Sequence, residues 1–484
     1  MYREGKSEKV AESDLATVSV KSDKQRFGAV HKALENAKEV HIPSEFSPNA
    51  GDSIEATEDG IARELVRRNG REIRFDNDLG AWFVWGNGAW RRDAVGIISE
   101  TLREIIRDAS SGWGDDKELR SVRRASFVNG AERMAKTDQK VSVIASYWDR
   151  DPLLLGCPNV TIDLRTGLER APSPDDGITK LCGTAPKDGS CPTWIQFLMD
   201  TTGNDEYVIE FIQMWFGYLL TGLTDEQVLL FIYGPGGNGK SVFLNTITRI
   251  LGDYSSTAAI DTFTKSRGDR HPTDLAMLYG ARSVSVSETE EGRPWAEARI
   301  KQLTGGDKVT ARFMRKDFFT FLPTFKLTIV GNHPPVLSDV DPAIRRRFLI
   351  LPFTRQPNVV DIDLEKKLWE EAPQILAWAT RGCLELQKRG LARPEAILAA
   401  TNQYFEDQDL FSQWLEECCE ISPANSFMSS AVLYQSWRRY AEDAGEDAGT
   451  QKMLGHKLKR NGLSSGQKRF RGKNCKGWLG ISLV

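Results

Sequence analysis

An eight-residue glycine-rich loop, together with its two flanks, constrains the fold of this chain more than any other feature. The loop is Gly234-Pro-Gly-Gly-Asn-Gly-Lys-Ser241, and it satisfies the pattern G-x-x-x-x-G-K-[ST]. The continuous apolar run Leu229–Tyr233 precedes it, as is typical of a strand buried on both faces. The helical run Val242–Leu251 follows and is closed by Gly252. Strand, loop and helix in this order predict a phosphate-binding loop on a parallel α/β sheet.

The residues of this loop suit the phosphates of a nucleotide bound with Mg²⁺. Glycines let backbone N–H groups curl around phosphates without Cβ clashes, and the helix N-terminus adds partial positive charge. Lys240 can reach the β- and γ-phosphates, and the Ser241 hydroxyl can ligate Mg²⁺. A chance match in a glycine-rich loop is the alternative, and the flanking strand and helix argue against it. The expected nucleotide-binding residues are Gly234, Pro235, Gly236, Gly237, Asn238, Gly239, Lys240, Ser241 and Val242.

Carboxylates follow a second predicted strand. The segment Arg282–Ser287 alternates serine with valine and runs into Glu288-Thr-Glu290-Glu291. We expect Glu288, at the strand end, to hold Mg²⁺ through water and to polarise the attacking water, with Glu290 as the second choice. If the segment stood alone, a solvated acidic loop would explain it equally well.

Two further segments favour nucleotide hydrolysis over phosphoryl transfer to a small molecule. The apolar run Phe325–Val330 predicts a strand, and Asn332 just beyond it could orient water against the γ-phosphate; a simple turn residue is the alternative. Three consecutive arginines, Arg345–Arg347, are poor material for a core. An arginine that reaches a neighbouring subunit's triphosphate accelerates hydrolysis by about 10³–10⁵. A basic surface run is the alternative reading.

A basic β-hairpin is predicted between these segments, over residues 309–321, with Arg315-Lys316-Asp317 near its tip. Basic side chains on such a hairpin could hold the phosphates of a DNA strand that passes through a ring. Taken alone, a hairpin is more often only a scaffold.

The order of these motifs resembles a known family. GPGGNGKS, SETEEG, KQLTGGD with ARFMRKDFF, FKLTIVGNHPP and DPAIRRRFLILPF follow one another as in the superfamily 3 helicases, and most closely as in the poxvirus, phage and plasmid primase–helicase group. The resemblance covers about Glu55 to Val484. It implies a AAA+ ATPase that forms a hexameric ring and translocates 3′→5′ on DNA, although the residues themselves do not establish the polarity.

The resemblance also implies roles for particular residues. Gly234–Ser241 corresponds to Walker A, Glu288 falls in Walker B, and Asn332 matches the sensor asparagine. The arginine-finger pair corresponds to Arg346 and Arg347, and the DNA-contacting hairpin to Arg312, Arg315 and Lys316. Many members carry two adjacent acids in Walker B, whereas Thr289 separates Glu288 from Glu290 here, so the division of tasks between the two stays open.

Larger relatives carry a primase domain upstream, whereas only a charge-rich segment of about fifty residues, without a zinc knuckle, precedes the recognisable region here. We therefore expect a helicase that depends on a separate primase.

The expected fold is an α/β AAA+ core with a parallel sheet, an N-terminal α+β domain and a C-terminal winged-helix domain. Hairpins are predicted to turn at Asn87-Gly88 and within Val160–Gly167, and helices are predicted over Thr193–Met199, Tyr207–Leu220 and Leu364–Arg389. The expected division is a mobile charged tail (1–50), an N-terminal α+β domain of the primase–helicase type (51–192), a helical collar or oligomerisation segment (193–225), the motor (226–395), a helical connector (396–429) and a winged helix (430–484).

Basic charge is concentrated at the C-terminal end of the chain. The net charge is 64 − 67 = −3, yet nine Lys and Arg and no Asp or Glu follow Ala448, so the preceding part sums to −12. Helices over Ser430–Ala441 and Lys452–Arg460 followed by a hairpin predict a winged helix. The expected DNA-binding residues of its hairpin are Lys468, Arg469, Arg471, Lys473 and Lys476. A solvated basic surface is the alternative.

Several other classes of protein are disfavoured. No run approaches the roughly 18 apolar residues of a membrane span, and the charged N-terminus lacks the apolar core of a signal peptide. The seven cysteines contain no C-x-x-C pair, which argues against a structural zinc site or a disulfide framework. We expect a protein of the cytoplasm, in a bacterial host.

The predicted function is that of an ATP-dependent replicative helicase of a phage, prophage or plasmid. Its expected cofactors are ATP and Mg²⁺, and its expected partners are single-stranded and forked DNA, identical subunits in a hexamer, and separate replication proteins. An origin-binding initiator, whose ATPase only switches its assembly state, is the alternative. A small-molecule kinase ranks third, because the basic tail and the arginine run do not suit it.

Overall fold

The computed structural model describes residues 54–110, 116–265, 273–287, 294–314, 317–332, 337, 341–357, 360–421, 426–470 and 473–484. Residues Ala56–Val484 form one compact unit, to which the following description applies. The predicted charged tail (1–50) lies outside the described residues. No helix in the described part of the chain is long and apolar enough to cross a membrane.

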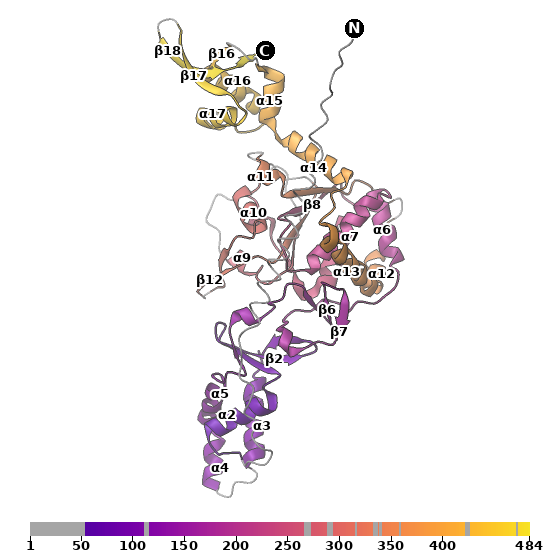
Figure 1. Cartoon of the computed structure of the whole chain (residues 1–484), viewed down its shortest axis with the longest axis vertical. Helices are drawn as coiled ribbons and strands as arrows, with labels where there is room; N and C mark the ends of the chain where they lie inside the picture. Colours follow the sequence, from indigo (N-terminus) through magenta and orange to yellow (C-terminus); the bar gives the residue numbers. More distant parts are fainter. Residues whose placement is uncertain are drawn as a thin grey trace, which may run out of the picture. The chain divides into compact units, whose positions relative to one another are not determined.

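A five-stranded parallel sheet lies at the centre of the region that contains the phosphate-binding loop (Figure 1). Its strands occur in the order β14-β8-β13-β10-β9. Their bounds are Phe348–Pro352 for β14, Leu229–Tyr233 for β8, Lys326–Gly331 for β13, Ser283–Ser287 for β10 and Ser255–Thr257 for β9. The strands predicted before the phosphate-binding loop, before Glu288 and before Asn332 are therefore confirmed.

Apolar residues on both faces explain why these strands are buried. Along β8, Leu230 and Ile232 pack with one core, whereas Leu229 and Phe231 pack with the other. Helices α6 (Pro192–Thr202), α7 (Glu206–Leu220), α8 (Lys240–Leu251) and α13 (Ala372–Arg389) contribute to the first core. Helix α10 (Glu297–Thr304) and helix α14 (Glu395–Gln408) contribute to the second. The alternation of period two along each strand thus serves two cores at once.

The predicted helix over Leu364–Arg389 is divided in two. Helix α12 (Leu364–Glu370) ends before Glu371, and α13 begins directly after it. Pro373 lies in the first turn of α13, where its missing N–H costs nothing, but a proline there cannot continue a helix from the preceding turn. The carboxylate of Glu371 accepts the N–H groups of Thr193 and Trp194 at 3.0 Å, so the break anchors the start of α6.

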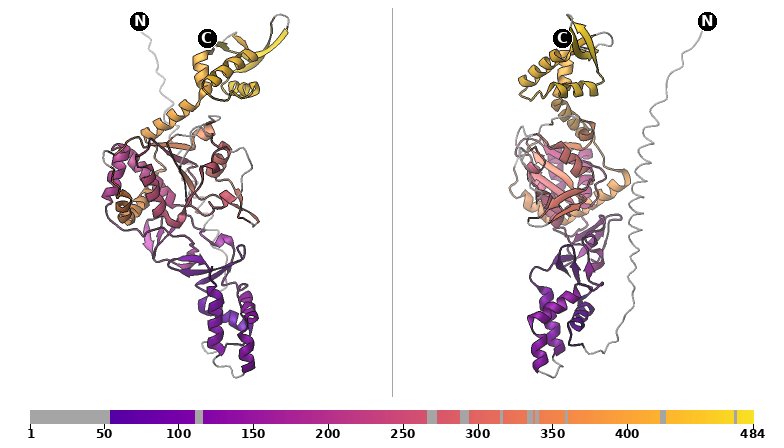
Figure 2. Two further views of the ribbon diagram at one scale, coloured as in Figure 1. Left: turned by 180° about the vertical axis from the view of Figure 1, so that it is seen from behind. Right: turned by 90° about the vertical axis from the view of Figure 1, so that its left-hand side faces the viewer.

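Helices α7 and α13 lie side by side and cross in close contact (Figures 1 and 2). Gly217 of α7 faces the backbone of Gly382 and Cys383, and Gly382 of α13 faces the backbone of Gln213. A Cβ atom at either glycine would overlap these backbone atoms. The two glycines therefore set the distance between the helices.

The region before the motor combines four helices with two small sheets. The helices are α2 (Glu58–Asn69), α3 (Ile97–Ser110), α4 (Asp116–Val122) and α5 (Ala125–Ala135). The first sheet has the order β3-β2-β1-β4, with β1 at Ile73–Asp76, β2 at Ala81–Gly86, β3 at Ala89–Arg92 and β4 at Ser142–Val143. The predicted turn between β2 and β3 is confirmed: Asn87 and Gly88 have φ values of 53° and 84°, as a tight hairpin turn requires.

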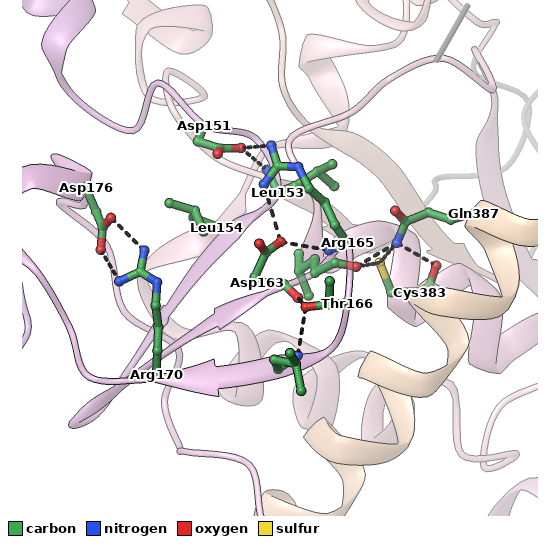
Figure 3. A network of polar contacts seen from close by, with 12 residues as sticks. Asp151, Leu153, Leu154, Asp163, Arg165, Thr166, Arg170, Asp176, Cys383 and Gln387 are labelled. Atoms are coloured by element: carbon green, nitrogen blue, oxygen red, sulfur yellow. Dashed lines mark hydrogen bonds and ion pairs between the residues drawn. The ribbon is translucent and has the colours of Figure 1, made fainter. Parts of the chain in front are cut away.

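The second small sheet contacts the motor helix α13. It consists of β5 (Leu154–Cys157), β6 (Val160–Asp163) and β7 (Leu168–Arg170), which confirms the second predicted hairpin. Figure 3 shows how its turn is held: Gln387 Nε2 of α13 donates to the carbonyl oxygen of Leu164 at 2.7 Å. In the same view, Arg165 bridges Asp151 at 2.7 Å and Asp163 at 3.3 Å.

The C-terminal part has a separate core. It contains α15 (Leu410–Cys418), β15 (Cys419–Ile421), β16 (Phe427–Ser429), α16 (Ser430–Asp443), α17 (Gln451–Arg460), β17 (Ser464–Phe470), β18 (Lys473–Leu479) and β19 (Ile481–Leu483). The predicted order of helix, helix and hairpin is confirmed. Leu433 and Trp437 of α16 are buried, whereas Val432 is 43% exposed, because one residue turns a helix by about 100° away from the buried stripe.

We expect the substitution Gly217→Ala to destabilise the protein, because its Cβ must displace the α13 backbone. Overpacking of this kind costs about 1–3 kcal/mol, against a gain in helix propensity of about 1 kcal/mol. A net loss should appear as a lower urea midpoint in tryptophan fluorescence. Gly130→Ala in α5 is the matched control, since its Cβ would approach Glu58 Cγ, a side-chain atom, at 2.9 Å. Equal midpoints for the two variants would contradict the close crossing.

Candidate nucleotide site

The phosphate-binding loop connects β8 to α8, and two of its glycines cannot be replaced without a clash. A Cβ atom at Gly234 (φ 154°) would overlap the carbonyl oxygen of Phe353, just after β14. A Cβ at Gly239 (φ 87°) would approach Phe197 Cε2 of α6 at 2.7 Å. The loop is thus packed between the end of one strand and the wall of one helix, and only glycine allows that approach.

Lys240 and Asn238 form a buried polar cluster inside the loop. Lys240 Nζ donates to the carbonyl oxygens of Gly234 at 2.6 Å and Pro235 at 2.9 Å, and to Asn238 Oδ1 at 2.9 Å. Asn238 Nδ2 in turn donates to the carbonyl oxygen of Phe353. Burial lowers the pKa of Lys240, which is only 6% exposed. All three acceptors are neutral, so phosphate oxygens could replace them with a gain in charge pairing.

A cavity of about 1200 Å³ adjoins this loop. Its walls come from the loop, from α6 and α8, and from β10 and the end of β13, together with Arg355, Pro357, Val360, Asp361, Leu364 and Lys367. Ligand pockets for small molecules usually span about 300–1000 Å³. The cavity therefore has room for a whole nucleoside triphosphate, with the loop glycines and Lys240 at its phosphate end.

Polar side chains at two strand ends face the same cavity. Ser287 is the last residue of β10, and Asn332 directly follows β13, its neighbour in the sheet. Both line the cavity together with Lys240 and Ser241. Glu288 and Glu290 lie outside the described residues, and Glu288 directly follows Ser287 in the chain.

Sequence reasoning missed some of the residues that line this cavity. Ser285 also faces it, and its Oγ lies 3.2 Å from Thr257 Oγ1 of β9. The signal was present in the alternation of serine and valine along β10, because alternate side chains point to one face. Asn238 was expected only as a member of the loop. The motif does not specify the residue type at this position, so it could not predict that Asn238 holds Lys240.

The three consecutive arginines have three different surroundings. Arg345 Nη2 donates to Asn402 Oδ1 at 2.9 Å. The side chain of Arg346 is exposed and makes no hydrogen bond or ion pair with side chains that the structure describes, whereas its backbone N–H donates to the carbonyl oxygen of Pro342 at 3.3 Å. Arg347 is 7% exposed; its Nε donates to Thr304 Oγ1 at 3.2 Å and its Nη1 to the Ala343 carbonyl oxygen at 2.6 Å.

Burial, and next the charge of Arg346, lower the pKa of Arg347. Among the described residues that line the nucleotide cavity of this chain, neither Arg346 nor Arg347 is present. The structure therefore separates the predicted arginine-finger pair into one outward-facing residue and one interior residue.

The predicted DNA hairpin is present as β11 (Val309–Arg312) paired with β12 (Phe318–Phe321). The guanidinium of Arg312 lies over the ring of Phe318, 4.8 Å from its centre, and Phe318 is 61% exposed. Phe313 stacks on Phe319 at 5.1 Å. Arg315 and Lys316 lie outside the described residues. The exposed aromatic rings were not singled out from the sequence, although they stand next to the predicted basic residues.

The C-terminal hairpin β17–β18 carries exposed Lys468, Arg469 and Lys476. Arg471 and the side chain of Lys473 lie outside the described residues. Helix α17 adds exposed Lys452, Lys459 and Arg460, which the spacing of a helix with buried Leu454 and Leu458 would have indicated.

Comparisons with known proteins agree with this arrangement. Residues 62–203 match the family model described as D5 N terminal like, and residues 232–347 match a family of unknown function (DUF5906). The chain is 25% identical over 376 residues to "Putative helicase L207/L206" of Acanthamoeba polyphaga mimivirus, which covers 71% of this chain and 39% of that protein. It is 27% identical over 240 residues to "Putative helicase 022R" of Frog virus 3, covering 45% of this chain and 24% of that protein.

A third relative is "Putative primase C962R" of African swine fever virus, 22% identical over 266 residues and covering 52% of this chain and 26% of that protein. These similarities support a protein of the superfamily 3 primase–helicase type. The chain spans about two fifths or less of the length of each of these three relatives.

Solved structures share the fold of this chain. The C-terminal region of NrS-1 in its A form superposes with a TM-score of 0.51 at 13% identity, covering 87% of this chain and 99% of that one. Another structure of that region (residues 305–718) gives 0.50 at 12% identity, with the same coverage. At this identity the likeness concerns the fold alone.

We expect substitutions at Arg346 and Arg347 to differ in their effect on stability. Arg347→Met leaves Thr304 Oγ1 and the Ala343 carbonyl oxygen without their donor, which should lower the free energy of unfolding by about 1–3 kcal/mol. Arg346→Met should change it by less than about 0.5 kcal/mol, because the side chain is exposed. Urea denaturation of both variants measures the difference, and a destabilised Arg346→Met with an unaffected Arg347→Met would contradict these placements.

Proposed function

We propose that this chain is an ATP-dependent replicative DNA helicase. It hydrolyses ATP with Mg²⁺ in a ring of six identical subunits. One observation carries the proposal: the cavity at which the phosphate-binding loop meets the polar ends of β10 and β13. A loop of this kind binds phosphate in many enzymes, but polar strand ends beside it suit the activation of water. The relatives named as helicases and a primase support the same class.

The proposal assigns tasks to the residues around the phosphate end of the cavity. The loop N–H groups and Lys240 hold the β- and γ-phosphates, and Ser241 with Glu288 holds Mg²⁺. Bound Mg²⁺ supplies positive charge against the phosphate oxygens. Asn332 orients the water, and Glu288, one residue beyond Ser287, accepts its proton. Glu290 is the second choice for either acidic task.

Arg346 is our candidate for the arginine supplied to a neighbouring subunit. Its exposure supports this role, because a side chain that acts on another subunit must extend from the surface of its own subunit. Arg347, which the resemblance pairs with it, is engaged inside its own chain by Thr304 and Ala343. We therefore propose that Arg347 holds the segment that presents Arg346.

DNA would contact two basic features. The hairpin β11–β12 offers Arg312, which Arg315 and Lys316 follow in the sequence, and exposed Phe318 provides a ring on which a base can stack. The β17–β18 hairpin, which we assign to a winged helix, offers Lys468, Arg469, Arg471, Lys473 and Lys476 to the DNA backbone.

We propose the division into an N-terminal α+β domain (51–192), a helical collar (193–225), a AAA+ motor (226–395), a connector (396–429) and a winged helix (430–484). ATP hydrolysis and unwinding would serve the replication of a phage, prophage or plasmid in a bacterial cytoplasm, with a separate primase. The viral sources of the relatives support a mobile replicon, but they do not support a bacterial host. An origin-binding initiator without processive unwinding is the second candidate, favoured by the basic charge of the C-terminal hairpin.

The first test is steady-state ATP hydrolysis with and without single-stranded DNA, with particle size measured alongside. We expect DNA to raise the rate, a ring-sized particle, and no hydrolysis by Lys240→Ala, because that variant loses the ammonium on the phosphates. A monomer whose hydrolysis ignores DNA would contradict the helicase. Displacement of a strand from a forked duplex then separates a helicase from an initiator, which would hydrolyse ATP but leave the duplex intact.

Mixing two inactive variants tests the assignment of Arg346. Arg346→Ala and Lys240→Ala should each lose hydrolysis, the former by about 10³-fold or more. In mixed rings, a Lys240→Ala subunit still provides Arg346 to the intact loop of an Arg346→Ala neighbour, so part of the activity should return. Mixing Arg346→Ala with Arg346→Ala prepared separately is the control. Absence of recovery in rings shown to be mixed would contradict an arginine supplied between subunits.

A further inference from the structure

Helix α10 connects the predicted DNA hairpin to the segment that bears Arg346. It ends at Thr304, and four residues, 305–308, lead from it into β11. Its other neighbour is the short helix α11 (Pro342–Arg345), which stands beside it in Figure 1 and immediately precedes Arg346. A displacement of the hairpin therefore reaches α10 directly through the backbone.

Two side chains of α10, one helical turn apart, hold the two ends of α11. Lys301 Nζ forms an ion pair with Asp341 Oδ2, directly before α11. Thr304 Oγ1 accepts the Nε of Arg347, directly after Arg346, at 3.2 Å. Thr304 and Arg347 are 5% and 7% exposed, so water competes little for the second contact.

Asp341 also determines where α11 begins. Its Oδ1 accepts the N–H of Ile344 at 2.7 Å, which makes it the N-cap of the helix. Burial is the largest single influence and raises the pKa of Asp341, but the hydrogen bonds from Lys301 and from backbone N–H groups, together with the charge of Lys301, bring that pKa below its usual value. The same carboxylate thus links the start of α11 to α10, while Arg347 links its end.

We propose that α10 couples DNA on the β11–β12 hairpin to the position of Arg346 in the neighbouring subunit's site, with Lys301, Thr304, Asp341 and Arg347 as positioning residues. This inference rests on the proposed function, because it assigns DNA to the hairpin and a neighbouring triphosphate to Arg346. None of the four residues touches DNA or nucleotide in it. They fix Arg345 and Arg346 between two attachments to one helix, so both arginines follow α10.

The substitution Asp341→Asn distinguishes the two roles of Asp341, which are the ion pair with Lys301 and the N-cap of α11. Asparagine caps a helix as well as aspartate, but it removes the charge that pairs with Lys301. Lys301→Met removes the same link from the other side. Thr304→Val removes the acceptor for Arg347 at nearly constant shape, and Thr304→Ser should restore it. Glu385→Gln, which removes the exposed Lys388–Glu385 pair of α13, is the control for loss of an ion pair elsewhere.

The measurement is ATP hydrolysis by the full chain with and without a single-stranded oligonucleotide, together with oligonucleotide affinity and urea midpoint. For Asp341→Asn, Lys301→Met and Thr304→Val we expect basal hydrolysis and affinity within about twofold of the unchanged protein. Stimulation by DNA should fall about three- to thirtyfold, the size of typical coupling effects. Thr304→Ser and Glu385→Gln should keep it, and Asp341→Asn with Lys301→Met should lose no more than either alone.

Three outcomes would overturn the inference. Unchanged stimulation in Asp341→Asn and Lys301→Met would show that the link carries no coupling. A proportional fall of basal and stimulated rates, with a lower urea midpoint, would show a purely structural role. If the unchanged protein itself ignores DNA, the proposed function fails first, and that result is visible before any variant is made.

Discussion

Two buried cations at the starts of β10 and β13 hold the sheet on which the site depends. Arg282 donates to the carbonyl oxygens of Leu220 at 2.5 Å and Leu154 at 2.7 Å, and Lys326 donates to that of Thr221. Leu220 and Thr221 end helix α7, where the carbonyl groups carry partial negative charge. Burial first, and the charge of Arg282 second, keep the pKa of Lys326 well below its ordinary value. The contact with Leu154 brings β5 to the same point, so one cluster joins the sheet, α7 and the region before the motor. Because the strands are parallel and in register, fixing their starts also fixes their far ends, where Ser287 and Asn332 face the cavity.

Local patterns in the chain predicted the motor well, since its strands are apolar runs followed by chemistry-bearing residues. The phosphate-binding loop, the hairpin turn at Asn87-Gly88 and the order of the C-terminal elements all depend on residues close in sequence. The division between α12 and α13 was missed even though Pro373 marks it, because apolar residues continue at helical spacing across the break. The cluster around Arg282 could not be predicted. Its acceptors are backbone carbonyls 62 and 128 residues away, and any residue type offers a carbonyl.

The arginine run shows the same limit at single-residue scale. Sequence reasoning treated Arg346 and Arg347 as equivalent, yet one faces outward and the other reaches Thr304 inside the chain. Adjacent residues at the end of a short helix point in directions about 100° apart. A family motif records which residue types occur. Only the packing of α10 against α11 shows that one of the two arginines, Arg347, is engaged in contacts within its own chain.

The contacts of Lys240 have a consequence for what the loop can admit. Its ammonium already donates to two carbonyl oxygens and to Asn238, so a ligand meets a positive charge whose hydrogen bonds are all made to neutral acceptors. A ligand that binds Lys240 must displace three hydrogen bonds. Its binding is favourable only if its own oxygens interact with the ammonium more strongly than the neutral oxygens that they replace. A nucleoside, or a nucleotide whose phosphates stop short of Lys240, would offer too little in exchange. The hydrogen bonds of Lys240 would thus favour ligands whose phosphates reach its ammonium over ligands that lack such phosphates.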